Sequence, residues 1–362
     1  MARIGRGQSG SFVVNGSPVT GFSSSARFID HRTGNAHPER PDRIRAIATA
    51  VRRAGMIDSP NPFPDFQIDL GLLPADGPAL VELPEPTPAD ERWLRAVHSQ
   101  EYIDRIRMTC ASGGGVLDAG DTPVGPQSFD VAKLAVGALI GCCDAVVGGR
   151  VNRAFAAARP PGHHAEPERP MGFCLFANVS IAARYLQRAH GVGKIAIVDF
   201  DVHHGNGTQA VFESDPSVLF VSLHQDPRTC YPGTGYASET GIGPGSGFTL
   251  NIPFPPGADD AQYLAAMREQ VIPKLDAFRP EFLLISAGFD AHRDDPLAQV
   301  DLSEDAFGEM TRILVDAADA HCAGRIVSAL EGGYDLRALG RSVVRHLHDL
   351  AGCTPLCGDL VG

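Results

Sequence analysis

Residues 194–207, KIAIVDFDVHHGNG, combine a short apolar run with a cluster of acidic and histidine side chains. The run at residues 195–198 is typical of a strand that is buried on both faces of a parallel sheet. Side chains alternate along an extended chain, so Asp199, Asp201 and His203 are expected on one side if the strand geometry lasts that far. Two carboxylates and an imidazole at the end of a buried strand indicate a metal site.

A less specific interpretation of this motif is also open. An Asp at a strand end often only caps the next helix, and a His-His pair is often exposed without being a ligand. The motif is therefore a hypothesis, and the ends of the other predicted strands must decide between a metal site and an ordinary loop.

The second half of the chain alternates between apolar runs and helical patterns. We predict strands at residues 153–158, 195–198, 218–223, 248–252, 282–285 and 326–330, and helices at 129–147, 178–190, 261–278 and 307–321. This alternation predicts a mostly parallel sheet, in which ligands bind at the carboxyl ends of the strands. The residues at those ends are His163, His164, Asp199, Asp201, His203, Ser222, Asp290 and Tyr334. Their convergence on one edge favours a metal or acid–base site.

Three of these residues have the chemistry of a metal centre. Asp201, His203 and Asp290 would supply three protein ligands, the number that a catalytic zinc ion uses while one position stays open for water. The two carboxylates leave Fe(II), Co and Mn as alternatives to zinc. A divalent ion in such a site lowers the pKa of a bound water and polarises a carbonyl group.

The remaining polar residues suit acid–base catalysis. His163 and His164 could act as general base and acid, and Asp199 and Asn206 are candidate partners, one ionic and one neutral, that would separate the two imidazole pKa values. Tyr334 could donate a hydrogen bond to a developing oxyanion, with a buried structural tyrosine as the alternative. Together these roles predict hydrolysis of an amide or ester carbonyl. The sequence contains no GxSxG motif, which disfavours covalent acyl transfer.

Composition limits the class of protein. A net charge of -12 and a pI near 5.5 argue against a nucleic-acid partner. The sequence has no apolar stretch of membrane-spanning length and no signal-peptide core, so we expect a cytoplasmic protein with mostly reduced cysteines and no membrane partner. We expect residues 1–362 to form a single domain, and residues 1–28, which are rich in Gly and Ser, to be a flexible arm or an entrance loop.

Five segments resemble one known superfamily. In order, they are RPPGHHAEPERPMGFCLFAN, VDFDVHHGNGTQAVF, VSLHQDPRTCYPGTG, SAGFDAHRDDPL and LEGGYD. They are similar to the zinc-dependent histone deacetylase and acetylpolyamine amidohydrolase superfamily over residues 31–346, and DVHHGNGTQ resembles its class II and bacterial amidohydrolase branch. The resemblance implies the arginase-deacetylase α/β fold, with a parallel sheet of eight strands between helices. It also implies an acetyl-lysine or related acetylated amine as substrate, with an acetylpolyamine as the alternative.

The resemblance implies roles for individual residues. It assigns zinc to Asp201, His203 and Asp290, acid–base catalysis to His163 and His164 with Asp199 and Asn206 behind them, and carbonyl polarisation to Tyr334. It assigns one potassium ion to Asp199, Asp201, His203, Ser222 and Leu223, and a second to Phe212, Asp215 and Val218. It places Gly172, Phe173 and Tyr231 in the walls of a substrate tunnel, Asp121 on its rim, Leu297 at a gatekeeper position, and Arg43 beside an internal acetate cavity.

Two positions depart from commoner family patterns. Tyr231 stands where one tunnel wall is usually Phe, and its hydroxyl could change acyl-chain or inhibitor preference. Leu297 stands where the vertebrate polyamine deacetylase has a Glu, which disfavours that form of polyamine selection. The bacterial form, which relies on loops built by a dimer, stays open, and with it a homo-oligomer.

Two other functions are weighed against deacetylation. An arginase-type ureohydrolase with two manganese ions needs extra bridging carboxylates, whereas Asn206 and the His163–His164 pair occupy the nearby positions. A binding protein that holds an acylated ligand without hydrolysing it would not need Tyr334 or the two histidines.

Overall fold

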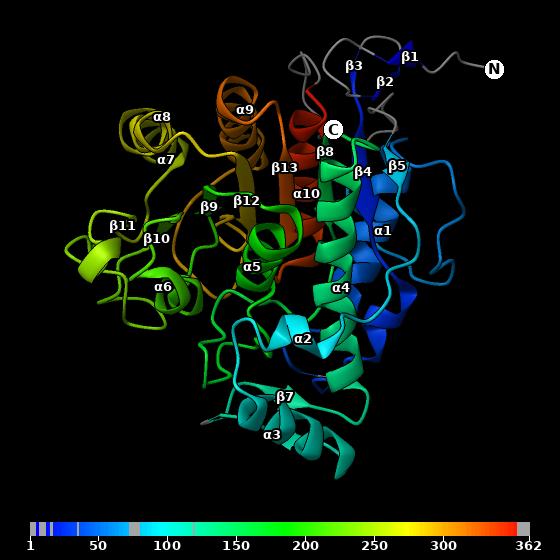
Figure 1. The fold of residues 1–362 in the computed structure, drawn as a ribbon. Coiled ribbons are helices and arrows are strands. Elements are labelled where there is room, and N and C mark those ends of the chain that lie inside the picture. The colour runs from blue at the N-terminus through cyan, green and yellow to red at the C-terminus, as the bar shows by residue number, and fades with distance from the viewer. Residues whose placement is uncertain are drawn as a thin grey trace.

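The computed structural model describes residues 19–34, 36–71, 80–118 and 120–352, together with the backbone of three short strands nearer the N-terminus. Those strands, β1 (Gly5–Arg6), β2 (Phe12–Val14) and β3 (Ser17–Pro18), form a small antiparallel sheet. The rest of the described chain is built around one large sheet (Figure 1).

The large sheet contains eight strands in the order β11-β10-β9-β12-β13-β8-β4-β5, and every neighbouring pair is parallel. The strands are β4 (Thr20–Ser23), β5 (Val81–Glu82), β8 (Arg153–Ala156), β9 (Ile195–Asp199), β10 (Val218–Gln225), β11 (Thr249–Phe254), β12 (Phe282–Ala287) and β13 (Ile326–Leu330). The predicted eight-stranded parallel sheet is therefore confirmed. A separate antiparallel pair consists of β6 (Gly115–Val116) and β7 (Pro123–Val124).

The register of the central strands aligns their carboxyl ends. Asp199, the last residue of β9, is paired with Ser222 in β10 and with Ser286 in β12. The strands β9, β12 and β13 are buried along their whole length, as expected for apolar runs covered on both faces. The polar segments that follow these strands consequently emerge at the same edge of the sheet.

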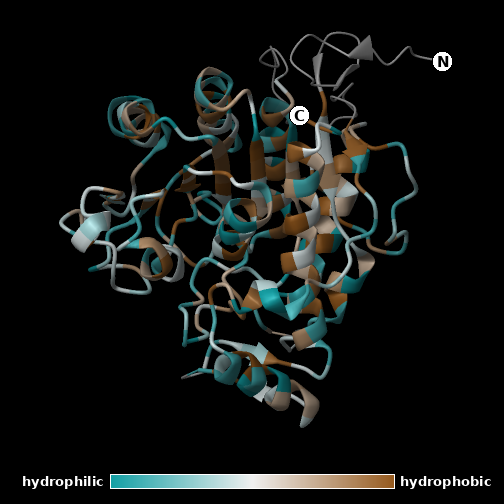
Figure 2. Cartoon of the chain, viewed as in Figure 1, coloured by the Kyte–Doolittle hydropathy of each residue, from teal (hydrophilic) through white to brown (hydrophobic). Residues whose placement is uncertain are grey.

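Helices cover both faces of the sheet (Figure 1). The helices are α1 (Asp42–Arg53), α2 (Glu91–Leu94), α3 (Gln100–Ala111), α4 (Ser128–Val147), α5 (Asn178–His190), α6 (Asn206–Phe212), α7 (Asp260–Ala266), α8 (Ile272–Phe278), α9 (Glu304–His321) and α10 (Leu336–Leu350). On one face α10 packs between α1 and α9, and on the other α4 packs against α5. Figure 2 shows hydrophobic residues gathered in the strands and in α4, whereas the outlying loops are mostly hydrophilic. None of the helices in the described ranges has the length and apolarity needed to cross a bilayer.

Most of the predicted elements are found, but the N-terminal prediction is partly wrong. Residues 20–23 form the buried strand β4, paired with β8 and β5, and Ala26–Asp30 form a 3-10 helix, instead of belonging to a flexible arm. A strand of only four residues with Gly and Ser has no clear sequence pattern, and its pairing with β8 decides its structure. Residues 1–18 of the predicted arm lie outside the described residues, apart from the backbone of β1 to β3, and so do Cys353 and Cys357. The single domain stays a prediction. The six described cysteines are free.

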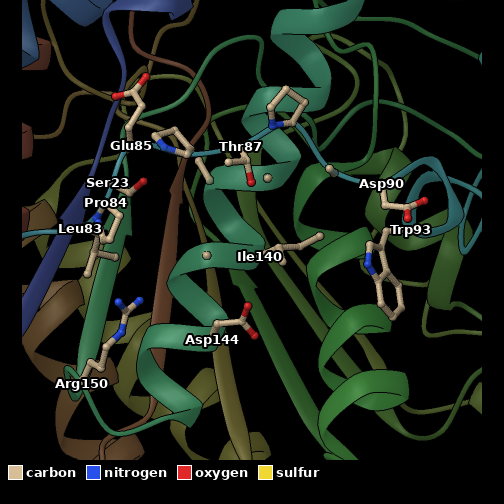
Figure 3. Close-up of a pocket in the computed structure, with 16 residues that line it drawn as sticks. Ser23, Leu83, Pro84, Glu85, Thr87, Asp90, Trp93, Ile140, Asp144 and Arg150 are labelled. Atoms are coloured by element: carbon tan, nitrogen blue, oxygen red, sulfur yellow. The ribbon is translucent and has the colours of Figure 1, made fainter.

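A proline-rich segment, residues 83–90, crosses over α4. Its ends are held by hydrogen bonds from Leu83 N to Phe22 O (2.8 Å) and from Ala89 N to Lys133 O (2.9 Å). Beside this crossing lies a cavity of about 350 Å³, bordered by Trp93 and Asp144 among others (Figure 3).

Two glycines of α4 line that cavity and differ in their surroundings. A Cβ at Gly137 would overlap the carbonyl oxygen of Thr87, whereas a Cβ at Gly141 would meet no atom within 4 Å. Gly137 is therefore required by the close approach of the crossing segment, and Gly141 is not.

We expect Gly137→Ala to lower the free energy of unfolding by about 1–3 kcal/mol, because the new methyl group forces the crossing segment away from α4. Gly141→Ala is the matched control, and it should be neutral or stabilising by up to about 1 kcal/mol, because Ala is favoured over Gly inside a helix. Urea denaturation measures both variants. Equal free energies of unfolding for the two variants would show that residues 83–90 do not pack closely against α4 at Gly137.

Candidate active site

A pocket of about 210 Å³ opens at the carboxyl edge of the sheet, and we call it the tunnel after the substrate tunnel that the resemblance implies. The residues that line it are Asp121, His164, Gly172, Phe173, His203, Tyr231, Leu297 and Tyr334. All eight were predicted from the sequence as catalytic, metal-binding or substrate-binding residues. The fold therefore brings together residues that are separated by more than 200 positions in the chain.

The candidate metal centre is buried at this tunnel. The ligand atoms of Asp201, His203 and Asp290 all lie within 4.8 Å of one another. The Nδ1 atom of His203 is 3.1 Å from Asp201 Oδ1 and 3.0 Å from Asp290 Oδ2. One imidazole nitrogen and two carboxylates match the three-ligand set of a catalytic metal with an open position.

Two carboxylates shape the turn that positions these ligands. Strand β9 ends at Asp199, so strand alternation does not extend to His203. Instead, Asp199 Oδ1 accepts a hydrogen bond from Asp201 N (3.0 Å), and Asp201 Oδ1 accepts one from His203 N (2.9 Å). Each carboxylate thus holds the backbone two residues further on, as Asp side chains do in turns.

The space around the carboxylates is kept free by glycine. A Cβ at Gly332 would overlap Asp290 and would lie 2.6 Å from Asp201 Oδ2, and a Cβ at Gly288 would overlap Asp201. The backbone N–H of Gly332 donates to Asp201 Oδ2 at 2.8 Å. Burial raises the pKa of Asp290, and the nearby charge of Asp201 raises it further. Two buried carboxylates this close favour a bound cation, so the residues present fit a divalent metal ion.

The two histidines that follow β8 have different partners. His163 Nδ1 lies 3.0 Å from Asp199 Oδ2, and His164 Nδ1 lies 2.7 Å from Asn206 Oδ1. The two rings pack with centroids 4.0 Å apart. The amide of Asn206 donates from Nδ2 to Glu166 Oε1 (2.8 Å), so its oxygen faces His164 Nδ1. His164 Nδ1 must then carry the proton, which leaves the lone pair on Nε2.

The partners separate the protonation states of the pair. Burial alone would lower the pKa of His163, but the carboxylates of Asp201 and Asp199 outweigh it and raise this pKa to about 10. Burial lowers the pKa of His164 well below its usual value, and the positive charge of His163 adds to the effect. At neutral pH the pair therefore consists of a charged His163 and a neutral His164 that can accept a proton.

Tyr334 enters the tunnel from the segment after β13. Its backbone N–H donates to Asp295 Oδ2 (2.6 Å), and its ring packs edge-on against Phe173 with centroids 5.8 Å apart. The fully buried guanidinium of Arg43 lies 5.0 Å from the ring centroid and donates to Gly333 O (2.7 Å). Burial raises the pKa of Tyr334 well above its usual value, so the hydroxyl stays protonated and can donate a hydrogen bond.

Aromatic side chains form the tunnel walls. Phe173 has a left-handed backbone (φ 68°), and a Cβ at the preceding Gly172 would overlap the His164 ring. Tyr231 is 40% exposed and its ring lies edge-on to His164, with centroids 5.2 Å apart. Leu297, 37% exposed, presents an apolar side chain at the mouth.

Residues 37–350 match the histone deacetylase domain, which covers most of the chain. The chain belongs to the histone deacetylase family. A histone deacetylase-like amidohydrolase of Pseudomonas aeruginosa is 43% identical over 71% of this chain and 67% of its own length. A probable deacetylase of Archaeoglobus fulgidus is 38% identical over 88% of this chain and 82% of its own length. The crystal structure of the HDA15 HD domain aligns with a TM-score of 0.82 at 36% identity, covering 94% of this chain and 92% of that chain.

Membership of the histone deacetylase family confirms the resemblance carried by the five sequence motifs, and the structural match confirms the arginase-deacetylase fold. Membership of this family makes this protein a hydrolytic deacetylase. The roles of the individual residues stay predictions, and the geometry described above is what supports them.

The sequence analysis missed the residues that hold the tunnel rim of this histone deacetylase family member. Asp118 Oδ1 accepts hydrogen bonds from the backbone N–H groups of Asp121 and Thr122, both at 3.0 Å. Thr122 Oγ1 in turn accepts from the backbone N–H of Phe173 (3.2 Å). Burial and the neighbouring Asp118 raise the pKa of Asp121 to about 6. The DAGDT sequence is typical of an Asp-stabilised turn, and this was the available signal.

The predicted potassium ligands fall into two groups. Ser222 and Leu223 lie in β10 beside Asp199, and Ser222 Oγ is already 2.9 Å from His224 Nδ1. In the second group, Asp215 Oδ2 accepts from Arg184 Nη1 at 2.6 Å. The backbone oxygens of Phe212 and Asp215 accept from Asp215 N (2.9 Å) and Val218 N (3.3 Å). Both potassium sites stay predictions.

The neutral state of His164 leads to a pH prediction. In the double variant Asn206→Asp/Glu166→Gln, a carboxylate replaces the neutral partner of His164 and still receives a hydrogen bond from residue 166. We expect the pKa of His164 to rise by about 1–3 units, because the opposite charge of the new carboxylate favours the imidazolium. A proton acceptor works only when neutral, so the acid limb of kcat/KM should move to higher pH. Steady-state pH profiles measure this shift.

The single variant Glu166→Gln is the control for that experiment, and its acid limb should stay at the wild-type position. An unmoved acid limb in the double variant would contradict the assignment of His164 as the proton acceptor.

Proposed function

We propose that this protein is a zinc-dependent amidohydrolase that removes acetyl or other acyl groups from acetyl-lysine or a related acetylated amine. The observation that carries the proposal is the convergence of three groups on one narrow tunnel: a buried three-ligand metal centre, a neutral His164 and a protonated Tyr334. The family membership supports deacetylation as the reaction class.

Zinc is the metal that we propose for Asp201, His203 and Asp290, with Fe2+ and Co2+ as alternatives. When bound, it would polarise the substrate carbonyl and lower the pKa of a water molecule. We also propose structural potassium at the position of Asp199, Asp201, His203, Ser222 and Leu223, with a second potassium at Phe212, Asp215 and Val218.

The catalytic residues divide the proton transfers and the charge stabilisation. His164 lines the tunnel with a neutral imidazole, so it is suited to take a proton from water and return it to the leaving amine. His163, paired with Asp199, keeps a positive charge beside the site. The hydroxyl of Tyr334 donates a hydrogen bond to the oxyanion that develops from the carbonyl.

The tunnel mouth favours acetyl-lysine over an acetylpolyamine as substrate. Leu297 offers no carboxylate for a distal ammonium group. Asp121 on the rim can accept hydrogen bonds from a peptide backbone, as the family resemblance implies. The acetylpolyamine remains the second candidate, because the acidic protein as a whole attracts cations.

Turnover by the zinc-reconstituted protein tests this function on two substrates, an acetyl-lysine peptide and N-acetylputrescine. We expect hydrolysis of the peptide to be faster, to stop with a chelator and to return with zinc, because a bound metal would activate the water that attacks the carbonyl. Preference for N-acetylputrescine would establish the second candidate. The absence of chelator-sensitive turnover on both substrates would contradict the proposed function.

We expect Tyr334→Phe to lower kcat by about 10²–10³-fold, because one donor to the oxyanion is lost. Zinc content should not change, since the Tyr334 hydroxyl is not a ligand. Tyr263→Phe is a matched control, because it also removes a buried hydroxyl, one that has no hydrogen-bond partner among the described residues. Steady-state kinetics and metal analysis of both variants measure the effects. A Tyr334→Phe variant with the kcat of the control would contradict the oxyanion role.

A further inference from the structure

Glu331 is a fully buried carboxylate directly after strand β13. It begins the segment that leads to Gly332, which donates to Asp201, and to Tyr334 in the tunnel wall. No role in metal binding or proton transfer falls to Glu331 in the site described above. A carboxyl group without solvent contact is expensive to bury, so its contacts with the protein must compensate.

The carboxylate of Glu331 holds the backbone of the histidine segment. Its Oε2 atom accepts hydrogen bonds from the backbone N–H of Gly162 (2.7 Å) and from that of His163 (3.1 Å). Its Oε1 atom accepts from the hydroxyl of Ser286, near the end of β12 (3.2 Å). One side chain therefore joins the segment after β8 to the ends of β12 and β13.

The backbone of Glu331 is itself held in place. Its N–H donates to Ala287 O (3.0 Å), and its carbonyl oxygen accepts from the Nη2 atom of buried Arg43. His163 is fixed on its other side, because its carbonyl oxygen accepts from Gly207 N (3.0 Å) and Thr208 N (3.2 Å). The histidine segment is thus held between Glu331 and the first turn of α6.

We propose that Glu331 is a positioning residue for the acid–base pair: by accepting two backbone N–H groups on one oxygen, it sets the location of His163 and His164 relative to the metal ligands. This inference rests on the proposed function. This role requires a hydrogen-bond acceptor at residue 331 that reaches the backbone N–H groups of both Gly162 and His163. Without it, two buried N–H groups lose their partner and the segment moves to satisfy them.

Two substitutions of Glu331 distinguish the effect of side-chain length from the effect of side-chain charge. Glu331→Asp keeps the charge but shortens the side chain by one methylene group, so one oxygen can no longer reach both N–H groups. Glu331→Gln removes the charge but keeps the reach, because the amide oxygen can accept from Gly162 and His163 while the amide nitrogen donates to Ser286 Oγ. If Glu331 acts as a hydrogen-bond acceptor, the Asp variant should lose kcat and the Gln variant should retain it. If Glu331 acts through its charge, the Asp variant should retain kcat and the Gln variant should lose it.

We expect Glu331→Asp to lower kcat by about 30- to 100-fold, because a shift of roughly 1 Å in a catalytic group has an effect of this size. KM and zinc content should stay within about threefold of wild type, because Glu331 touches neither the tunnel nor a metal. Glu331→Gln should retain kcat within about threefold. Glu331→Met, which has similar length and no acceptor of this strength, is the second damaging variant if the Asp variant folds poorly.

Ser286→Ala is the matched control. It removes the partner of Oε1 and leaves both backbone contacts of Oε2 intact, so kcat should again stay within about threefold of wild type. The proposal is overturned if the Gln variant loses as much kcat as the Asp variant, if neither the Asp nor the Met variant loses kcat, or if the loss accompanies a loss of zinc.

Crystal structures of the Asp and Gln variants give a readout that does not need turnover. We expect the backbone at residues 162–163 to be displaced in Glu331→Asp and unmoved in Glu331→Gln. An unmoved backbone in both variants would overturn the positioning role even if the wild-type protein hydrolysed neither substrate. Inactive wild-type protein, by contrast, would overturn the proposed function alone.

Discussion

Two buried carboxylates that share one imidazole are the constraint on which the rest of the site depends. Asp201 and Asp290 both approach Nδ1 of His203 to about 3 Å, and glycine at positions 288 and 332 leaves the carboxylates room. Negative charge this concentrated is unfavourable away from water unless a cation balances it. The parallel register places the ends of β9 and β12 level with each other, so the two carboxylates meet at the edge of the sheet.

The surrounding polar groups are arranged around this charge in pairs. Asp199 keeps His163 charged, whereas the neutral Asn206 leaves His164 uncharged and able to accept a proton. The two imidazoles acquire different protonation states because the carboxylates of Asp201 and Asp199 outweigh burial at His163, whereas burial and the charge of His163 prevail at His164. Because such buried networks are costly when incomplete, each member needs its own support. Asn206 is oriented by Glu166 and, in our inference, the histidine backbone is positioned by Glu331.

In the proposed function, the tunnel walls would add selectivity for shape to this electrostatic arrangement. Phe173 adopts a left-handed backbone conformation, and its amide is held by Thr122, which Asp118 orients through the rim turn. The Phe173 wall therefore stands on a hydrogen-bonded turn. In the proposed function, a methylene chain between these walls would exclude water, which would strengthen the hydrogen bond that Tyr334 donates.

The sequence by itself determined the central strands and the candidate catalytic and metal-binding residues. Runs such as residues 195–198 and 282–285 are apolar because both faces of a parallel sheet are covered, and polar residues can follow only where such a strand ends. Only the tertiary structure decided that residues 20–23 form the strand β4, because these four residues become a strand by pairing with β8. It also decided the contacts of Glu331, whose hydrogen-bond partner Gly162 lies 169 positions away. Periodicity reports which face of an element is buried, but a hydrogen bond between distant segments leaves no local pattern in the sequence.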